Sequence, residues 1–225
     1  MEEKAGKVFR LAQEYPPVPG CTISKEAFHG DSDSAIYFSL AEDTDISAEI
    51  YRAPKLWIGL DGDLEAFTKE TEDGKSVEKA SPLLPGSLYV TPAGVPVGIR
   101  AKTDGVYMEL ELGKDAAMNK VLKAGNVFAL KDLLPYQDGR IVNMDLINQD
   151  DLKFVLMSFD AGTGLSEHAA PGEAIIFALD GEAVIGYEGK EYRIKAGENF
   201  KFDKLGRHSI TADHKFKMGL LLQLA

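Results

Sequence analysis

Two histidines in the last third of the chain are the residues best suited to chemistry. His168 follows the segment GTGLSE, and His208 ends the segment GENFKFDKLGRH. Neutral imidazole is a ligand for iron, manganese, nickel, copper and zinc. It also titrates near neutral pH, so it can act as an acid or a base. What these side chains can do depends on the elements that hold them.

Those elements belong to an internal repeat. Residues 4–62 align without a gap on residues 123–181, at a constant offset of 119 residues. The alignment keeps turn-forming residues, for example Gly20 on Gly139, and it ends with the same Leu-Asp-Gly run in both copies. We interpret the repeat as a duplication of one structural unit.

The repeat continues after an interruption. Residues 86–90 align on residues 197–201 at an offset of 111 residues, so the first copy is eight residues longer between the two blocks. The extra length falls in the polar stretch 68–79, which predicts a longer hairpin or a surface loop.

Each copy consists of short apolar segments separated by glycine-containing turns, a pattern typical of a β-sandwich or barrel. Between the copies, residues 113–124 contain a candidate N-cap, Asp115, followed by good helix formers and by Gly125. This pattern predicts one short linking helix. We place the boundary between the domains there, as residues 1–113 and 114–225.

The second copy resembles the two signature motifs of the cupin superfamily. In the first motif, Gly162 is separated by five residues from His168, which holds the first histidine place. Ala170 stands where the family has a second histidine, and Ala174 stands where it has a glutamate. In the second motif, His208 holds the histidine place. The resemblance covers nearly all of the second copy.

The resemblance implies an all-β fold of two tandem cupin barrels, each a double-stranded β-helix or jelly roll of the RmlC type. Single-domain cupins commonly dimerise, so such a bicupin is expected to pack as an internal pseudo-dimer. A further homodimer is compatible with the sequence.

The first copy keeps the framework of the motifs and has lost their histidines. By the repeat alignment, Glu49, Tyr51 and Lys55 occupy the three ligand places of the first motif, and Val97 replaces the histidine of the second. We predict that Glu49 and Lys55 form an ion pair inside the barrel, because a buried charge requires a partner. The alternative is that both side chains are solvated at the barrel mouth.

The resemblance also implies a metal site, because cupins usually bind a transition metal through three histidines and one glutamate. Only His168 and His208 remain, and strand alternation turns Glu167 and Glu173 outward unless a bulge brings Glu173 in. Three interpretations stay open: a divalent transition metal (Fe, Mn, Ni, Cu or Zn), a metal-free organic ligand bound or protonated by the histidines, or two structural histidines. An apolar wall would complete a ligand site. Its residues are Ala170, Ala174, Ile176 and Ala178.

Composition limits the partners. The net charge of −11 argues against nucleic acid and against an anionic membrane surface. The single cysteine, Cys21, allows no intrachain disulfide and fits a reducing, cytoplasmic setting. The start of the sequence does not look like a secretory leader, and no apolar run reaches the ~20 residues of a membrane span.

The expected function is therefore a small-molecule-binding bicupin with a depleted metal site in the C-terminal barrel. The alternative is a metal- or histidine-assisted enzyme, such as an oxygenase, isomerase or lyase, acting on a small organic substrate. An active site of the usual cupin kind is expected in residues 123–225, with the first copy as its structural partner.

Overall fold

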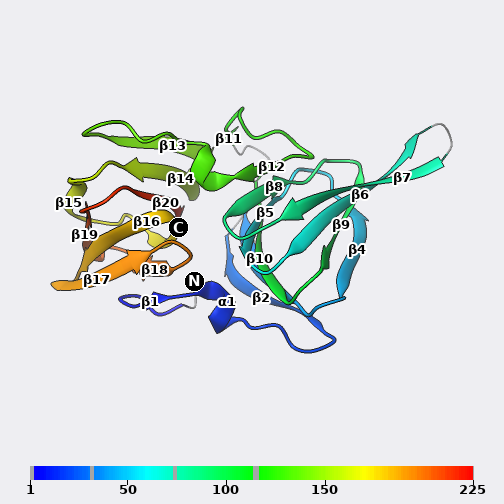
Figure 1. Cartoon of the computed structure of the whole chain (residues 1–225), viewed down its shortest axis with the longest axis horizontal. Helices are drawn as coiled ribbons and strands as arrows, with labels where there is room; N and C mark the ends of the chain where they lie inside the picture. The colour runs from blue at the N-terminus through cyan, green and yellow to red at the C-terminus, as the bar shows by residue number, and fades with distance from the viewer. Residues whose placement is uncertain (1–2, 31–32, 73–74, 114–116, 225) are drawn as a thin grey trace. The chain divides into compact units, whose positions relative to one another are not determined.

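The structure is a computed structural model, and it describes residues 3–30, 33–72, 75–113 and 117–224. The chain divides into two compact units (Figure 1). Unit 2 contains most of the first copy of the repeat, and unit 1 contains most of the second copy. Each unit is a β structure, as the sequence predicted.

Unit 2 is a sandwich of two sheets. The six-stranded sheet has the order β12-β8-β5-β10-β3-β2, and the four-stranded sheet has the order β4-β9-β6-β7. Buried residues of both sheets pack together, including Trp57 and Tyr107 from the larger sheet and Val97 and Ile99 from the smaller one. The strands of the six-stranded sheet are β2 (Thr22–His29), β3 (Ser34–Leu40), β5 (Leu56–Asp61), β8 (Ser87–Val90), β10 (Gly105–Glu111) and β12 (Val127–Ala129). Those of the four-stranded sheet are β4 (Asp45–Ile50), β6 (Leu64–Glu72), β7 (Lys75–Leu83) and β9 (Pro96–Ala101).

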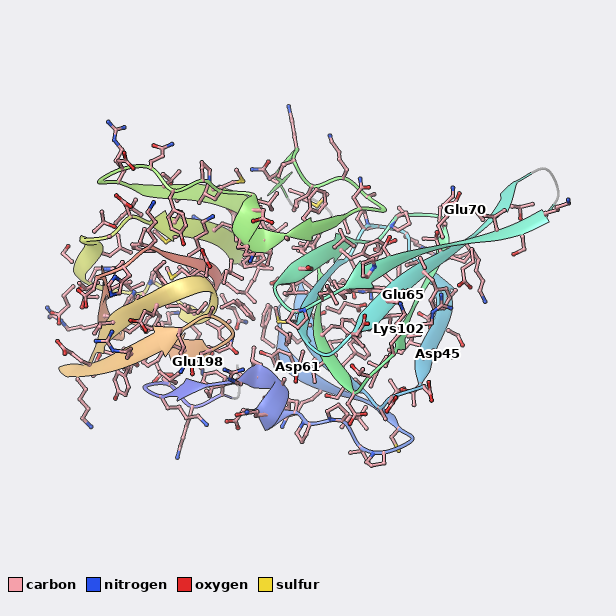
Figure 2. All side chains as sticks on the ribbon, viewed as in Figure 1. Asp45, Asp61, Glu65, Glu70, Lys102 and Glu198 are labelled. Atoms are coloured by element: carbon pink, nitrogen blue, oxygen red, sulfur yellow. The ribbon has the colours of Figure 1, made fainter. Side chains whose placement is uncertain are left out.

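The polar insertion forms a long hairpin. Strands β6 and β7 pair antiparallel along their whole length, from Leu64 with Leu83 to Glu72 with Lys75. The prediction of a longer hairpin in the stretch 68–79 is therefore confirmed. Glu65 in β6 pairs through its carboxylate with Arg100. The same carboxylate pairs with Lys102, which is labelled near it in Figure 2.

Unit 1 is built around one strand that serves both of its sheets. The first half of β16 (Glu173–Tyr187) pairs with β18 and β20, and its second half pairs with β17 and β19. The ladder is irregular between Ala178 and Asp180, just before Gly181. Gly181 has φ +69°, and a Cβ atom there would overlap the carbonyl oxygen of Lys215, so the position requires glycine. Gly62, its repeat equivalent, has φ +77° and the same restriction against Asp104.

The remaining elements of unit 1 complete its barrel. The main path of pairing runs β1-β18-β16-β20-β14-β13-β11, and β15 joins through β19. Its other strands are β1 (Val8–Phe9), β11 (Ala117–Met118), β13 (Ile141–Asn148), β14 (Leu152–Phe159), β15 (Thr163–Ala169), β17 (Lys190–Lys195), β18 (Asn199–Phe202), β19 (Arg207–Ala212) and β20 (Phe216–Gln223). The described helical elements of the chain are α1 (Leu11–Glu14) and the 3-10 turn η1 (Leu130–Asp132).

The first strand of each copy belongs to the other copy's unit. Val8 and Phe9 in β1 pair with Phe200 and Asn199 in β18. Their repeat equivalents, Val127 and Phe128 in β12, pair with β8 of the first copy. Relative to the division expected at 113/114, the N-terminal residues up to Leu11 belong to unit 1, and residues 120–129 belong to unit 2.

The predicted linking helix is wrong for the part of the segment that the structure describes. Ala117 and Met118 form β11, which pairs with Asn148 and Ile147 of β13. Asn119 then donates a hydrogen bond from its amide to the carbonyl oxygen of Asp145. Sheet pairing here replaces the helical hydrogen bonds, while the candidate N-cap Asp115 lies outside the described residues. Among the helices described, none is long and apolar enough to cross a membrane.

Candidate functional site

The two motif histidines lie side by side. His168 in β15 and His208 in β19 are directly paired across the antiparallel ladder. Their ring centroids are 4.2 Å apart, and the rings are tilted by 55°. His168 is exposed, whereas His208 is only 6% exposed. One imidazole of the pair is therefore open to solvent, and the other is buried in unit 1.

Backbone hydrogen bonds select the tautomer of both imidazoles. Nδ1 of His168 lies 2.8 Å from the carbonyl oxygen of Ser166, and Nδ1 of His208 lies 3.0 Å from that of Gly206. A carbonyl oxygen accepts only, so each Nδ1 carries the proton. In the neutral rings both Nε2 atoms then keep a free lone pair, which can accept a hydrogen bond or bind a cation.

His208 sits against an aromatic wall. Its ring stacks on Phe202, with centroids 4.0 Å apart, and Phe202 in turn contacts Tyr187. Burial lowers the pKa of His208, the charge of His168 adds to this, and the hydrogen bond to Gly206 opposes it. His208 is consequently neutral at neutral pH and presents an acceptor at Nε2.

The predicted apolar wall is buried. Ala174, Ile176 and Ala178 belong to the core cluster that also contains Phe202 and Tyr187. Ala170 is 4% exposed, and its carbonyl oxygen accepts a hydrogen bond from the backbone of Leu205, in the turn that leads to His208. All four residues are thus placed in the same unit as the histidines.

The described residues do not fit the metal set that the resemblance implies. Glu167 pairs with Arg207 at 2.6 Å, and Glu173 pairs with Lys201 at 3.4 Å, so both neighbouring carboxylates are committed to cations. Within the described ranges, no three residues of the types His, Cys, Asp and Glu are grouped to hold a metal ion. Two imidazoles remain where the family uses four ligands.

The first copy contains a second cluster, and its ion pair differs from the prediction. The ammonium of Lys55 lies 2.7 Å from Glu109 and 3.4 Å from Glu111. Glu49 is exposed, and Lys55 pairs with these two residues of β10 instead. The predicted Glu49–Lys55 pair is therefore wrong, because β10 places carboxylates beside Lys55.

Both oxygens of the Glu109 carboxylate are held. One accepts the hydrogen bond from Lys55, and the other accepts a 2.7 Å hydrogen bond from the indole of Trp57. Burial acts to lower the pKa of Lys55, but the hydrogen bond and charge of Glu109, aided by Glu111, outweigh it and raise that pKa. Lys55 is consequently a firmly charged ammonium and a poor nucleophile.

Two tyrosines complete the cluster. The Lys55 ammonium lies 4.5 Å from the centre of the Tyr51 ring, and both Tyr51 and Tyr107 contact Trp57. Burial and then Glu109 raise the pKa values of Tyr51 and Tyr107, so both phenols stay protonated.

Sequence reasoning missed Tyr107, Glu109 and Glu111, although a signal for them exists. They alternate within the segment VYMELEL, so they share one face of β10. What the sequence does not contain is the pairing of Glu109 with Trp57 of β5, which brings that face to Lys55.

The fold is that of the cupin class. The Cupin domain family model matches residues 155–222. The chain is similar to the solved structure of a Cupin 2 conserved barrel domain protein from Leptotrichia buccalis, with 23% identity, a TM-score of 0.78, and 99% of this chain and 98% of that chain covered. Among proteins with curated functions, none matches the sequence.

Other structural neighbours are more distant. Salicylate 1,2-dioxygenase from Pseudoaminobacter salicylatoxidans is similar with 11% identity, a TM-score of 0.59, and 97% of this chain and 81% of that chain covered. A putative glyoxylate-induced protein from Pseudomonas aeruginosa is similar with 14% identity, a TM-score of 0.55, and 90% and 79% covered. The cupin family match is confined to residues 155–222, and at these identities the neighbours indicate the fold alone.

Proposed function

We propose that the protein is a bicupin, with domains 1–113 and 114–225, whose C-terminal barrel binds a small organic molecule through His168 and His208. The observation that carries this proposal is the paired imidazoles, whose Nδ1 atoms are both tied to backbone carbonyls. Their Nε2 atoms are left for a ligand, one at an exposed residue and one at a buried residue.

The chemistry of the pair defines the ligand class. Neutral Nε2 atoms accept hydrogen bonds, so they favour a ligand with hydroxyl or N–H donors. When His168 is protonated, the same edge can donate to a carboxylate. Hydroxylated and carboxylated small molecules therefore fit the site best, with the rings of His208 and Phe202 as an apolar flank.

Ligand screening by thermal shift tests the proposal. A ligand at 100 times its dissociation constant stabilises the folded protein by about 2.7 kcal/mol. We expect hits among hydroxylated and carboxylated compounds with wild type and with His214→Ala, which alters an exposed histidine of the β19–β20 turn. The same hits should be lost in His168→Ala and His208→Gln.

Two results would overturn the proposal. Hits that persist unchanged in both histidine variants would place the ligand elsewhere. Stoichiometric Fe, Mn, Ni, Cu or Zn in the purified protein, lost in His168→Ala, would replace it with a metal site. Turnover of a bound hit that is lost with the histidines would establish the enzymatic alternative.

A further inference from the structure

The Lys55 ammonium of the first copy is surrounded by groups that recognise organic ammonium ions. A carboxylate oxygen of Glu109 lies 2.7 Å away, one of Glu111 lies 3.4 Å away, and the Tyr51 ring centre lies 4.5 Å away. A carboxylate together with an aromatic face is the usual combination for binding ammonium groups.

These groups are preorganised. The side chains of Lys55 and Glu109 are 17% and 6% exposed, so this is not a surface pair. Trp57 fixes the second oxygen of Glu109. The backbone of Lys55 is fixed as well, because its N–H donates to the hydroxyl of Thr91 and its carbonyl accepts from the Thr91 N–H.

The surroundings favour a cation beyond what Lys55 itself requires. Glu109 and Glu111 give two negative charges against the one positive charge of Lys55, and the charge of Glu49 reaches both Tyr51 and Tyr107. Tyr107, whose ring contacts Trp57, is 1% exposed.

The place of Lys55 in the repeat suggests why a lysine is there. Lys55 aligns with Ala174, the place where the cupin motif has its acidic ligand. We propose that the first barrel contains an ammonium-binding site that the chain fills with its own Lys55, and that removal of this head group opens the site to an external primary alkylammonium ion. The lysine acts as a tethered ligand, which closes the first barrel to other cations.

The test uses Lys55→Ala and its complement. The substitution removes the equivalent of n-propylammonium, so n-propylammonium chloride is the probe and n-propanol is its neutral counterpart. Trp57 is the only tryptophan of the chain and contacts Glu109, so its fluorescence reports binding directly. We expect a saturable response of Lys55→Ala to n-propylammonium, at least tenfold weaker when Glu109→Gln is added.

The controls separate binding from space filling. Wild type and Lys102→Ala, which alters an exposed lysine of the same unit, should give no saturable response. An equal response of Lys55→Ala to n-propanol, or no saturable response to n-propylammonium, would overturn the proposal.

If Lys55→Ala does not fold, a second pair of variants tests the proposal. Lys55→Met keeps the aliphatic stem and leaves Glu109 without its cation, so its unfolding midpoint in urea should fall clearly below that of wild type. Adding Glu109→Leu should restore the midpoint. A Lys55→Met protein as stable as wild type would overturn the proposal.

Discussion

Glu109→Gln should destabilise unit 2 more than any other single exchange of a carboxylate for an amide on β10. The amide keeps the shape of the side chain and can still accept from Trp57, but Lys55 loses its 2.7 Å charge partner. Breaking a buried pair from one side costs about 3–5 kcal/mol. Because Lys55 is 17% exposed and Glu111 stands 3.4 Å away, we expect the lower end, about 3 kcal/mol.

Urea unfolding followed by Trp57 fluorescence measures this loss in unit 2, because the chain has no other tryptophan. With m-values of about 1–3 kcal/mol/M, the midpoint should fall by roughly 1–3 M. Glu111→Gln is the matched control on the same face of the strand. Its side chain is 58% exposed, and exposed pairs contribute about 0.2–1 kcal/mol. Equal midpoints for the two variants would refute the reasoning.

Three further changes test unit 1 by urea unfolding followed by circular dichroism, with the repeat or a second glycine as control. The lowered pKa of His208 means that the unfolded chain binds the proton more readily, so the free energy of unfolding falls as the pH falls below about 6.5. His208→Gln should reduce the dependence of this free energy on pH by up to about 1.4 kcal/mol per pH unit. Equal pH dependence in wild type and variant would contradict the lowered pKa of His208. Gly181→Ala should cost well over the about 1–2 kcal/mol expected for Gly139→Ala, because both have positive φ but only Gly181 meets a backbone oxygen; similar costs would show that the bend tolerates a side chain. Ser158→Ala should be neutral or stabilising because the buried Ser158 hydroxyl has no partner among the described residues. Ser39→Ala, at the equivalent position of the first copy, should cost about 1 kcal/mol because it removes the 2.7 Å hydrogen bond to the carbonyl oxygen of Tyr15. A clear loss of stability in Ser158→Ala would contradict this expectation.

The β architecture could be predicted because it follows from local patterns, and the two candidate histidines could be named because they stand at motif positions. Glycines at turns and period-two strands are properties of neighbouring residues, and the repeat shows them twice. The resemblance to the cupin motifs placed His168 and His208 in one barrel, and the ladder pairs them directly. The helix prediction failed over residues 117–124 because helix propensity and capping describe an isolated peptide. In the folded chain, Ala117 and Met118 pair with β13 instead.

The Lys55 cluster could not be derived from the repeat alone. The alignment shows which residues replaced the motif ligands, and it contains no information on which side chains approach them. Glu109 is 54 residues from Lys55, and only the pairing of β10 with β5 joins them. The repeat alignment also could not reveal the exchange of the first strands, β1 and β12. The two copies align in the same way whichever unit each strand joins.

That exchange has a consequence for synthesis on the ribosome. Val8 is translated 192 residues before its partner Phe200. At about 5–20 residues per second, the N-terminal strand waits roughly 10–40 s for its ladder. The first barrel needs only β12 to be complete, so it can close while the second is still being made. Strand β1, by contrast, is translated long before β18, the strand with which it pairs.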